Sequence, residues 1–236
     1  MKWFAIILAA VIGTVVLYKM AYPSVTLRYR LTLEAEVDGQ TKTGSGVIEA
    51  SYQKHMSLGA VGRDVAAGFR GEAVALDLGS RGTLFALLKA GSDSRSGPES
   101  IVLNTFGLPG GAFPGWDAES LGKLRSLSGK RELPLENLPM LVRFRDVNDP
   151  MTVEAVNPSN IAERFGSGAR LVRATLEIVP AGIWPLNSFG ITGEPLTTGI
   201  QERLNWLRRL NGGYLDGGFT SRNAPLGLYG WDFERE

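Results

Sequence analysis

Residues 25–37 read V-T-L-R-Y-R-L-T-L-E-A-E-V, with an apolar residue at every odd position and a polar residue at every even position. Successive side chains of a strand point to opposite faces of a sheet, so this alternation predicts one half-buried strand. Asp38 and Gly39 follow, a pair that favours the two-residue type I′ turn of a β-hairpin. We therefore expect residues 41–51 to return as an antiparallel strand.

A two-residue turn also fixes which residues of the two strands lie opposite each other. The expected pairs are Val37 with Gln40, Leu33 with Gly44, Leu31 with Gly46, Tyr29 with Ile48 and Arg28 with Glu49. In this register, Arg28 and Glu49 are opposite charges on the solvent face. The two glycines leave space over the leucines, and another element must fill it.

Outward from this hairpin, further alternating and apolar runs predict more strands. They lie at residues 72–78, 83–89, 101–106, 140–145, 152–156 and 170–179. Helices are fewer and shorter. They are expected at 117–127 after an Asp117 cap, at 157–166 beginning with Asn157 and Pro158, and at 198–211, where Thr198 and Gln201 have capping-box spacing.

The longest apolar run lies at the N-terminus, where residues 3–18 carry no charge. Twenty helical residues reach about 30 Å, the thickness of the hydrocarbon core of a bilayer. Trp3 and Tyr18 stand where interfacial aromatic residues belong, and Pro23 ends the helix. We expect residues 1–22 to be a transmembrane anchor that contacts the lipid bilayer through residues 3–22.

Two other interpretations of this segment stay open. A cleavable secretory signal shares the basic start and the apolar core, but it ends in small residues, and Tyr18-Lys19-Met20-Ala21 fits that pattern poorly. A buried helix of a soluble protein needs a polar face, which residues 3–17 lack. Nearby lysines and arginines oppose an external C-terminus, yet long domains are translocated largely regardless of charge. We expect a cytoplasmic N-terminus and an exported body.

No Pro/Ser-rich linker divides the rest of the chain, so residues 23–236 are expected to form one extracytoplasmic domain. The fold class predicted is α+β and β-rich, with an N-terminal transmembrane helix followed by one mainly antiparallel sheet domain with short helices.

Composition excludes several functional classes. The chain has 25 Lys and Arg against 24 Asp and Glu, without a basic cluster, so no nucleic acid partner is expected. It has no Cys and one His, which argues against thiolate metal sites and disulfide scaffolds. No phosphate-binding glycine motif is present, so no nucleotide is expected. We predict no cofactor and no metal.

Residues 43–48 read T-G-S-G-V-I and precede His55. This order resembles the strand before the catalytic His of trypsin-like envelope proteases. His55 lacks the T-N-x-H-V setting of that family, however, and no G-N-S-G-G nucleophile loop follows it. We interpret His55 as a loop residue.

Other polar and aromatic groups allow two interpretations each. Asp146, Asn148 and Asp149 resemble the start of a calcium loop, but Met151 and Asn157 occupy the required Gly and Glu positions, so we favour a turn. Glycoside hydrolysis needs a pair of carboxylates, and the candidates, equally explained as polar strand positions, are Glu34, Glu49, Asp77 and Glu154. The rings expected either to close the core or to form an exposed surface are Tyr229, Trp231 and Phe233.

Several stretches together are similar to an uncharacterised proteobacterial group of exported proteins, some of them lipoproteins and others membrane-anchored. They are Y-R-L-T-L-E at 29–34, T-G-S-G-V at 43–47, G-E-A-V at 71–74, D-L-G at 77–79, L-V-R-F at 141–144, D-P at 149–150, R-A-T-L-E-I at 173–178 and T-T-G-I at 197–200. The resemblance implies an envelope location and brings no activity, fold or catalytic residues. This chain lacks the lipobox Cys, so a helix must hold it to the membrane.

The first hypothesis is therefore a single-pass protein of the bacterial inner membrane whose periplasmic domain binds or scaffolds another envelope protein without catalysis. A second is a carboxylate-based hydrolase of cell-wall material. A third is an accessory subunit of a membrane complex, because Ala9 and Gly13 have the small-xxx-small spacing that permits close helix packing. Catalytic residues are unknown.

Overall fold

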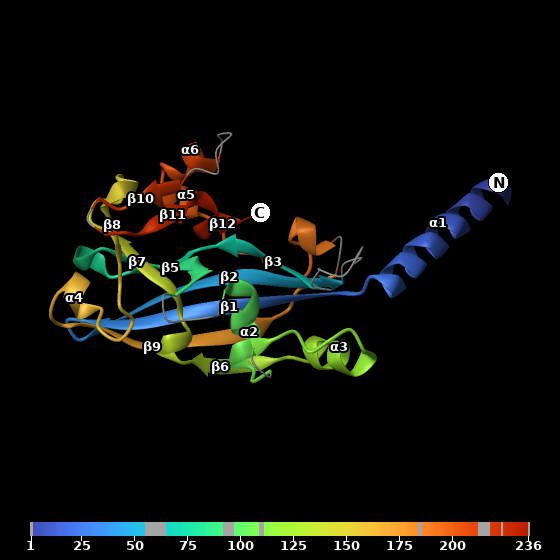
Figure 1. The fold of residues 1–236 in the computed structure, drawn as a ribbon, viewed down its shortest axis with the longest axis horizontal. Helices are drawn as coiled ribbons and strands as arrows, with labels where there is room; N and C mark the ends of the chain where they lie inside the picture. Colours follow the sequence, from blue (N-terminus) through green and yellow to red (C-terminus); the bar gives the residue numbers. More distant parts are fainter. Residues whose placement is uncertain are drawn as a thin grey trace.

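The computed structural model describes residues 2–54, 65–91, 97–108, 111–183, 186–211, 218–222 and 224–235, without the side chains of residues 2, 4, 5, 8, 9, 12, 15, 188 and 211. Two antiparallel sheets and the C-terminal segments form its body, and helix α1 (Lys2–Ala21) extends away from that body (Figure 1). The structure is β-rich with a few short helices, as predicted.

The hairpin predicted from residues 25–51 is present. Strand β1 (Ser24–Val37) pairs with β2 (Gln40–Lys54), and the turn residues Asp38 and Gly39 have φ of 51° and 80°. Positive φ at both positions is what a type I′ turn requires. All five predicted cross-strand pairs occur, which confirms the register.

The hairpin forms the centre of a six-stranded antiparallel sheet. Its order is β12-β3-β2-β1-β9-β6 (Figure 1). The added strands are β3 (Val65–Glu72), β6 (Gly129–Leu133), β9 (Ala169–Val179) and β12 (Glu234–Arg235). The odd-numbered residues of β1 from Val25 to Val37 are all buried in the main core.

A second sheet covers the apolar face of this hairpin. Its order is β4-β5-β7-β8, and its strands are β4 (Val74–Asp77), β5 (Thr83–Ala90), β7 (Pro139–Phe144) and β8 (Val153–Ala155). A Cβ built on Gly44 would lie 2.4 Å from the carbonyl oxygen of Ala75, and one on Gly46 would lie 2.9 Å from Cγ2 of Val74. Strand β4 therefore fills the space predicted over the leucines.

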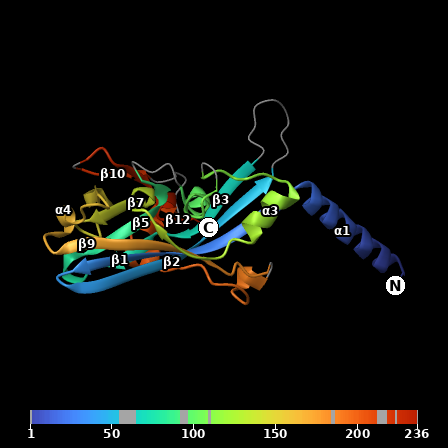
Figure 2. The same cartoon turned by 90° about the horizontal axis from the view of Figure 1, so that it is seen from below.

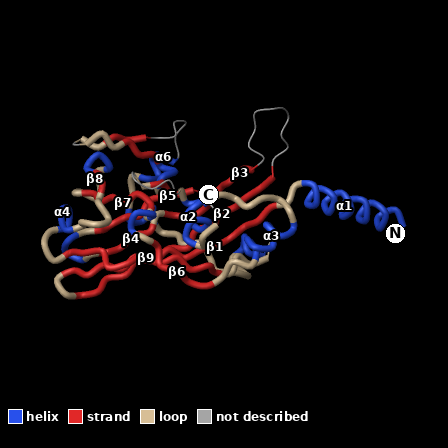
Figure 3. The backbone as a smooth tube through the Cα atoms, turned by 60° about the horizontal axis from the view of Figure 1, so that its bottom comes forward, coloured by secondary structure: helices blue, strands red, loops and turns tan. Residues whose placement is uncertain are grey.

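The second sheet is buried on both faces, so the body has three layers (Figure 3). Leu84, Ala86 and Leu88 of β5 belong to the main core, whereas Phe85 and Leu87 belong to a second, aromatic-rich core. The third layer contributes Trp206, Leu228 and Phe233 to that core. It contains α5 (Ile200–Arg203), α6 (Leu207–Asn211), β10 (Gly218–Thr220), β11 (Gly227–Tyr229) and the 3₁₀ turn η6 (Gly230–Asp232).

The strand predicted at 101–106 is wrong, because these residues belong to helix α2 (Pro98–Thr105). An apolar run such as Ile101-Val102-Leu103 is compatible with either structure. Pro98 at the first helical position decides in favour of the helix, and the run is buried against the main core. The hydroxyl of Tyr29 donates to the carbonyl of Pro98 and fixes the helix on the sheet.

Other boundaries also differ from the prediction. The strand expected at 72–78 is divided at Ala73, where the chain passes from β3 in the first sheet to β4 in the second. The helix expected at 157–166 shrinks to α4 (Ala162–Phe165), and that at 198–211 is divided into α5 and α6. Helix α3 (Ala118–Arg125) forms as predicted, because Asp117 accepts from the backbone N–H of Ser120. The remaining 3₁₀ turns are η1 (Gly79–Arg81), η3 (Leu135–Asn137), η4 (Pro150–Thr152) and η5 (Leu186–Phe189).

The predicted transmembrane anchor at residues 1–22 has no support from the structure. Within the described ranges, no helix has the length and apolar character needed to cross a membrane. The segment is helical as α1, and its described large apolar side chains are exposed; Trp3 is 79% exposed and Met20 75%. The anchor stays a prediction.

We predict that Gly44→Ala lowers the free energy of unfolding by about 1–3 kcal/mol, because the added methyl group meets the backbone of β4 and the two sheets must separate. Gly122→Ala in α3 is the matched control, since nothing lies within 4 Å of its Cβ position and alanine favours helix by roughly 0.5–1 kcal/mol. Urea unfolding followed by circular dichroism measures both. Equal effects of the two substitutions would contradict the proposed contact.

Candidate functional site

The four carboxylates considered for hydrolysis have separate partners. Glu34 accepts two hydrogen bonds from Arg173, at 2.8 and 2.9 Å. Asp77 accepts from the backbone N–H of Gly79, two residues on, where the turn η1 begins. Among the described residues, His, Cys, Asp and Glu side chains form no group of three that could hold a metal ion. The structure thus gives no pair of these carboxylates facing a shared cavity.

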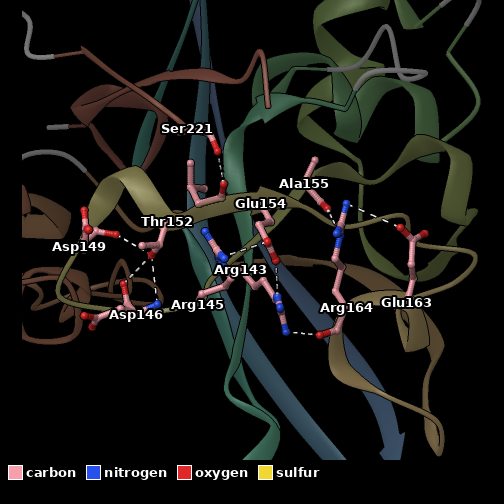
Figure 4. A network of polar contacts seen from close by, with 11 residues as sticks. Arg143, Arg145, Asp146, Asp149, Thr152, Glu154, Ala155, Glu163, Arg164 and Ser221 are labelled. Carbon is pink, nitrogen blue, oxygen red and sulfur yellow. Dashed lines mark hydrogen bonds and ion pairs between the residues drawn. The ribbon is translucent and has the colours of Figure 1, made fainter. Parts of the chain in front are cut away.

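Glu154 lies in a polar network at the edge of the second sheet (Figure 4). Its carboxylate forms two ion pairs: Oε2 lies 2.9 Å from Nε of Arg143, and Oε1 lies 3.3 Å from Nε of Arg145. Arg143 also donates to the carbonyl of Arg164, and Arg164 donates to the carbonyl of Ala155, so the network ties α4 to strands β7 and β8. These contacts neutralise Glu154 and give it a structural role.

The cluster predicted as a turn in preference to a calcium loop is a turn. Asp146 accepts from the backbone N–H of Asn148 at 2.9 Å, and Asp149 accepts from that of Met151 at 3.0 Å. The hydroxyl of Thr152 donates toward the carbonyls of both aspartates (Figure 4). The aspartate oxygens therefore organise the connection from β7 to β8.

The pair Arg28–Glu49 has the predicted register but the wrong environment. Its Nε–Oε2 distance is 2.8 Å, and the two side chains are 4% and 10% exposed, so the pair does not face solvent. The chain returning after β9 covers it, because Arg28 also donates to the carbonyl of Glu194 at 2.6 Å. A sequence pattern could not reveal this cover, which comes from a residue 166 positions away.

Glu72, rather than Thr198, caps helix α5. Its carboxylate accepts from the backbone N–H of Ile200 at 2.7 Å, while Gln201 donates to Glu234 instead of completing a capping box. Burial raises the pKa of Glu72, although hydrogen bonds from the backbone of Ile200 and Gly199 partly offset that rise.

The most site-like feature is an apolar cleft of about 360 Å³, which falls within the usual size of small-ligand and side-chain pockets. It lies where η3, the β7–β8 pair and residues 224–226 meet, and its walls include Leu135, Met140, Leu141, Val156, Pro158 and Leu226. Glu136, Asn157 and Ser159 supply polar groups. Apolar walls with a few polar groups suit a binding site better than a hydrolytic centre. No single stretch of the sequence indicates this cleft, because three distant segments build it.

Of the three C-terminal aromatic residues, one closes the core and two lie partly at the surface. Phe233 is fully buried in the second core. Tyr229 and Trp231 stack on each other with their ring centroids 4.4 Å apart, and they are 41% and 39% exposed. The prediction of rings that close the core therefore holds for Phe233 only.

His55 lies outside the described residues, so its interpretation as a loop residue stays a prediction. The chain matches no protein-family model, and no curated protein or solved structure shows significant similarity to it.

We predict that Arg28→Met destabilises the protein by about 3–5 kcal/mol, because it removes the closer charge partner of the buried Glu49 carboxylate and leaves only the half-exposed Arg70, 3.8 Å away. The double variant Arg28→Met/Glu49→Leu is expected to recover most of this loss. Arg170→Met is the control, since the Arg170–Glu36 pair is largely exposed and is worth less than about 1 kcal/mol. Urea unfolding of the parent and the three variants provides the values; a double variant no more stable than Arg28→Met would contradict the coupling.

A pH dependence follows from Glu72. Its folded pKa lies above its unfolded pKa, so the carboxyl binds more protons in the folded state, and stability is lost as pH rises from the ordinary value of 4.5 to the folded pKa. Glu72→Gln removes this titration while keeping an oxygen for the N–H of Ile200. We expect its stability relative to the parent to rise across this window. A pH-independent difference in unfolding midpoint would contradict the shift.

Proposed function

We propose that this chain is a single-pass protein of the bacterial inner membrane. Residues 1–22 would form the anchor, the N-terminus would be cytoplasmic, and the periplasmic body, residues 23–236, would bind another envelope protein without catalysis. The apolar cleft on the body carries the binding part of this proposal, because it offers apolar walls and few polar groups.

The anchor is proposed from the sequence of α1 taken as a whole, including the side chains that the structure does not describe. Between Lys2 and Lys19 the segment has no charged residue. The described apolar side chains of the helix are exposed, Ile7 by 61% and Leu17 by 69%, so the body does not cover this part of its surface. A lipid bilayer is the environment that removes such a surface from water.

An apolar segment of a protein is the proposed occupant of the cleft. Met140 and Leu226 in its walls are partly accessible, so an inserted apolar side chain would remove more surface from water. Two exposed polar residues lie at the cleft, Glu136 and Asn157. Both could accept hydrogen bonds from backbone N–H groups of the inserted segment, and the Asn157 amide could also donate to its carbonyls.

The hydrolase hypothesis has less support, because the carboxylates named for it are held by arginines or by a backbone N–H group. The accessory-subunit hypothesis draws on α1. Nothing within 4 Å meets a Cβ built on Gly13, so another helix has room to approach there. It is compatible with the binding function, since the complex itself would then supply the partner.

The test uses the full chain with a reporter after Glu236 that is active only outside the cytoplasm. We expect an active reporter that stays in the membrane fraction after washing with high salt and alkali. A soluble, active fusion would overturn the anchor, and an inactive, membrane-bound fusion would overturn the orientation.

The cleft is tested in the same cells with a photoreactive amino acid at Leu226, and at Val172 on β9 as a control with an exposed apolar side chain outside the cleft. We expect one discrete crosslinked protein from position 226, lost when Met140→Asp places a charge in the cleft. Equal crosslinking from both positions, or crosslinking that Met140→Asp leaves unchanged, would overturn the proposed binding site.

A further inference from the structure

The described residues of the segment 180–193 carry four exposed large apolar side chains. The segment contains no charged residue. Phe189 is 73% exposed, Ile183 69% and Ile191 67%, and Leu186 is 42% exposed. These four lie within nine residues of one another, whereas the other exposed large apolar side chains of the described body occur singly or in pairs, and each of them is at most 42% exposed. A concentration of this kind on a surface marks a contact with a partner or a membrane.

The segment is a closed loop with internal hydrogen bonds. The backbone N–H of Glu194 donates to the carbonyl of Pro180 at 2.8 Å and so joins the two ends. Inside the loop, Asn187 donates to the carbonyl of Ala181 at 3.0 Å, and the N–H of Ile183 donates to the hydroxyl of Thr192 at 3.0 Å. The apolar side chains are therefore presented on a preformed frame, as in compact Ω-type loops.

Two arginines of β1 hold the base of this loop. Arg28 donates to the carbonyl of Glu194, and the guanidinium of Arg30 lies 2.6 Å from the carboxylate of Glu194. Val179, the last residue before the loop, is opposite Arg28. Ser24, where β1 begins, is only four residues from Arg28, about 14 Å along a strand.

The loop consequently lies at the end of the body from which α1 leaves. Helix α1 ends at Ala21, and β1 begins three residues later. Figures 1 and 2 both place the loop, drawn in orange, in the half of the body nearest α1.

We infer that this loop inserts its apolar side chains into the lipid interface beside α1. The inference rests on the proposed membrane anchor, and it commits to the phospholipid surface as the occupant. A segment without charge can enter the interface without desolvating ions, and exposed Phe, Ile and Leu side chains are those that interfacial segments bury, at a depth of about 5–10 Å. A second contact beside α1 fixes the orientation of the body to the membrane.

The chain has no cysteine, so single-cysteine labelling of the full chain is direct. A polarity-sensitive fluorophore is attached at Phe189→Cys, at Val172→Cys near the far end of β9, and at Val11→Cys in α1, with all three proteins reconstituted into phosphatidylethanolamine vesicles containing phosphatidylglycerol. Quenching by acyl-chain spin-labelled lipid and by aqueous iodide is measured. Because these three residues are 73%, 42% and 54% exposed, labels there should not disturb the core, which the circular dichroism spectrum checks.

We expect lipid quenching and several-fold weaker iodide quenching at positions 189 and 11, with the reverse at 172. Lipid quenching at 11 together with an aqueous label at 189 would overturn the loop insertion and leave the anchor intact. A label at 189 shielded from both quenchers would assign the loop to a protein contact and also overturn the inference. An aqueous label at position 11 would overturn the anchor itself.

Discussion

The close approach of two backbones at Gly44 is the constraint on which the arrangement of the body depends. Strand β4 lies directly against β2 at Gly44 and Gly46, which have no side chains to keep the two strands apart. The second sheet therefore packs on the leucines of β1. The opposite face of the second sheet is also apolar, and this contact does not cover it. The C-terminal segments are therefore required as a third layer, and the rings of Trp206 and Phe233 complete it.

The same layering explains why polar chemistry is scarce inside the body. A sheet buried on both faces has no polar side for a catalytic group. Glu34 and Glu154 lie at the outer surface and at the sheet edge, where arginines meet them. The buried carboxylates Glu49, Glu72 and Asp232 are held by Arg28, by the backbone N–H of Ile200 and by Lys89. At the edge of the β7–β8 pair, where the middle layer ends, an apolar cavity remains accessible. The binding function proposed for the body is located at this boundary between layers.

Local signals in the sequence were enough to predict the hairpin with its register, because alternation and the Asp38-Gly39 turn act within one short stretch. Features built by distant residues could not be predicted. Glu72 caps a helix 128 positions away, and Glu194 covers Arg28 from a distance of 166 positions. Strand β6, which reads G-K-R-E-L, carries charges suited to a sheet edge and has no apolar alternation to reveal it. The cleft likewise has no signature in any single segment.

The outer face of the β1–β9 pair shows a further consequence of its charges. Three opposite-charge pairs lie directly across it, Arg30–Glu177, Glu34–Arg173 and Glu36–Arg170. Sliding one strand by two residues separates all three, although the apolar face would still match. The three pairs therefore favour the observed alignment of β9 on β1, between registers that the apolar face alone does not distinguish.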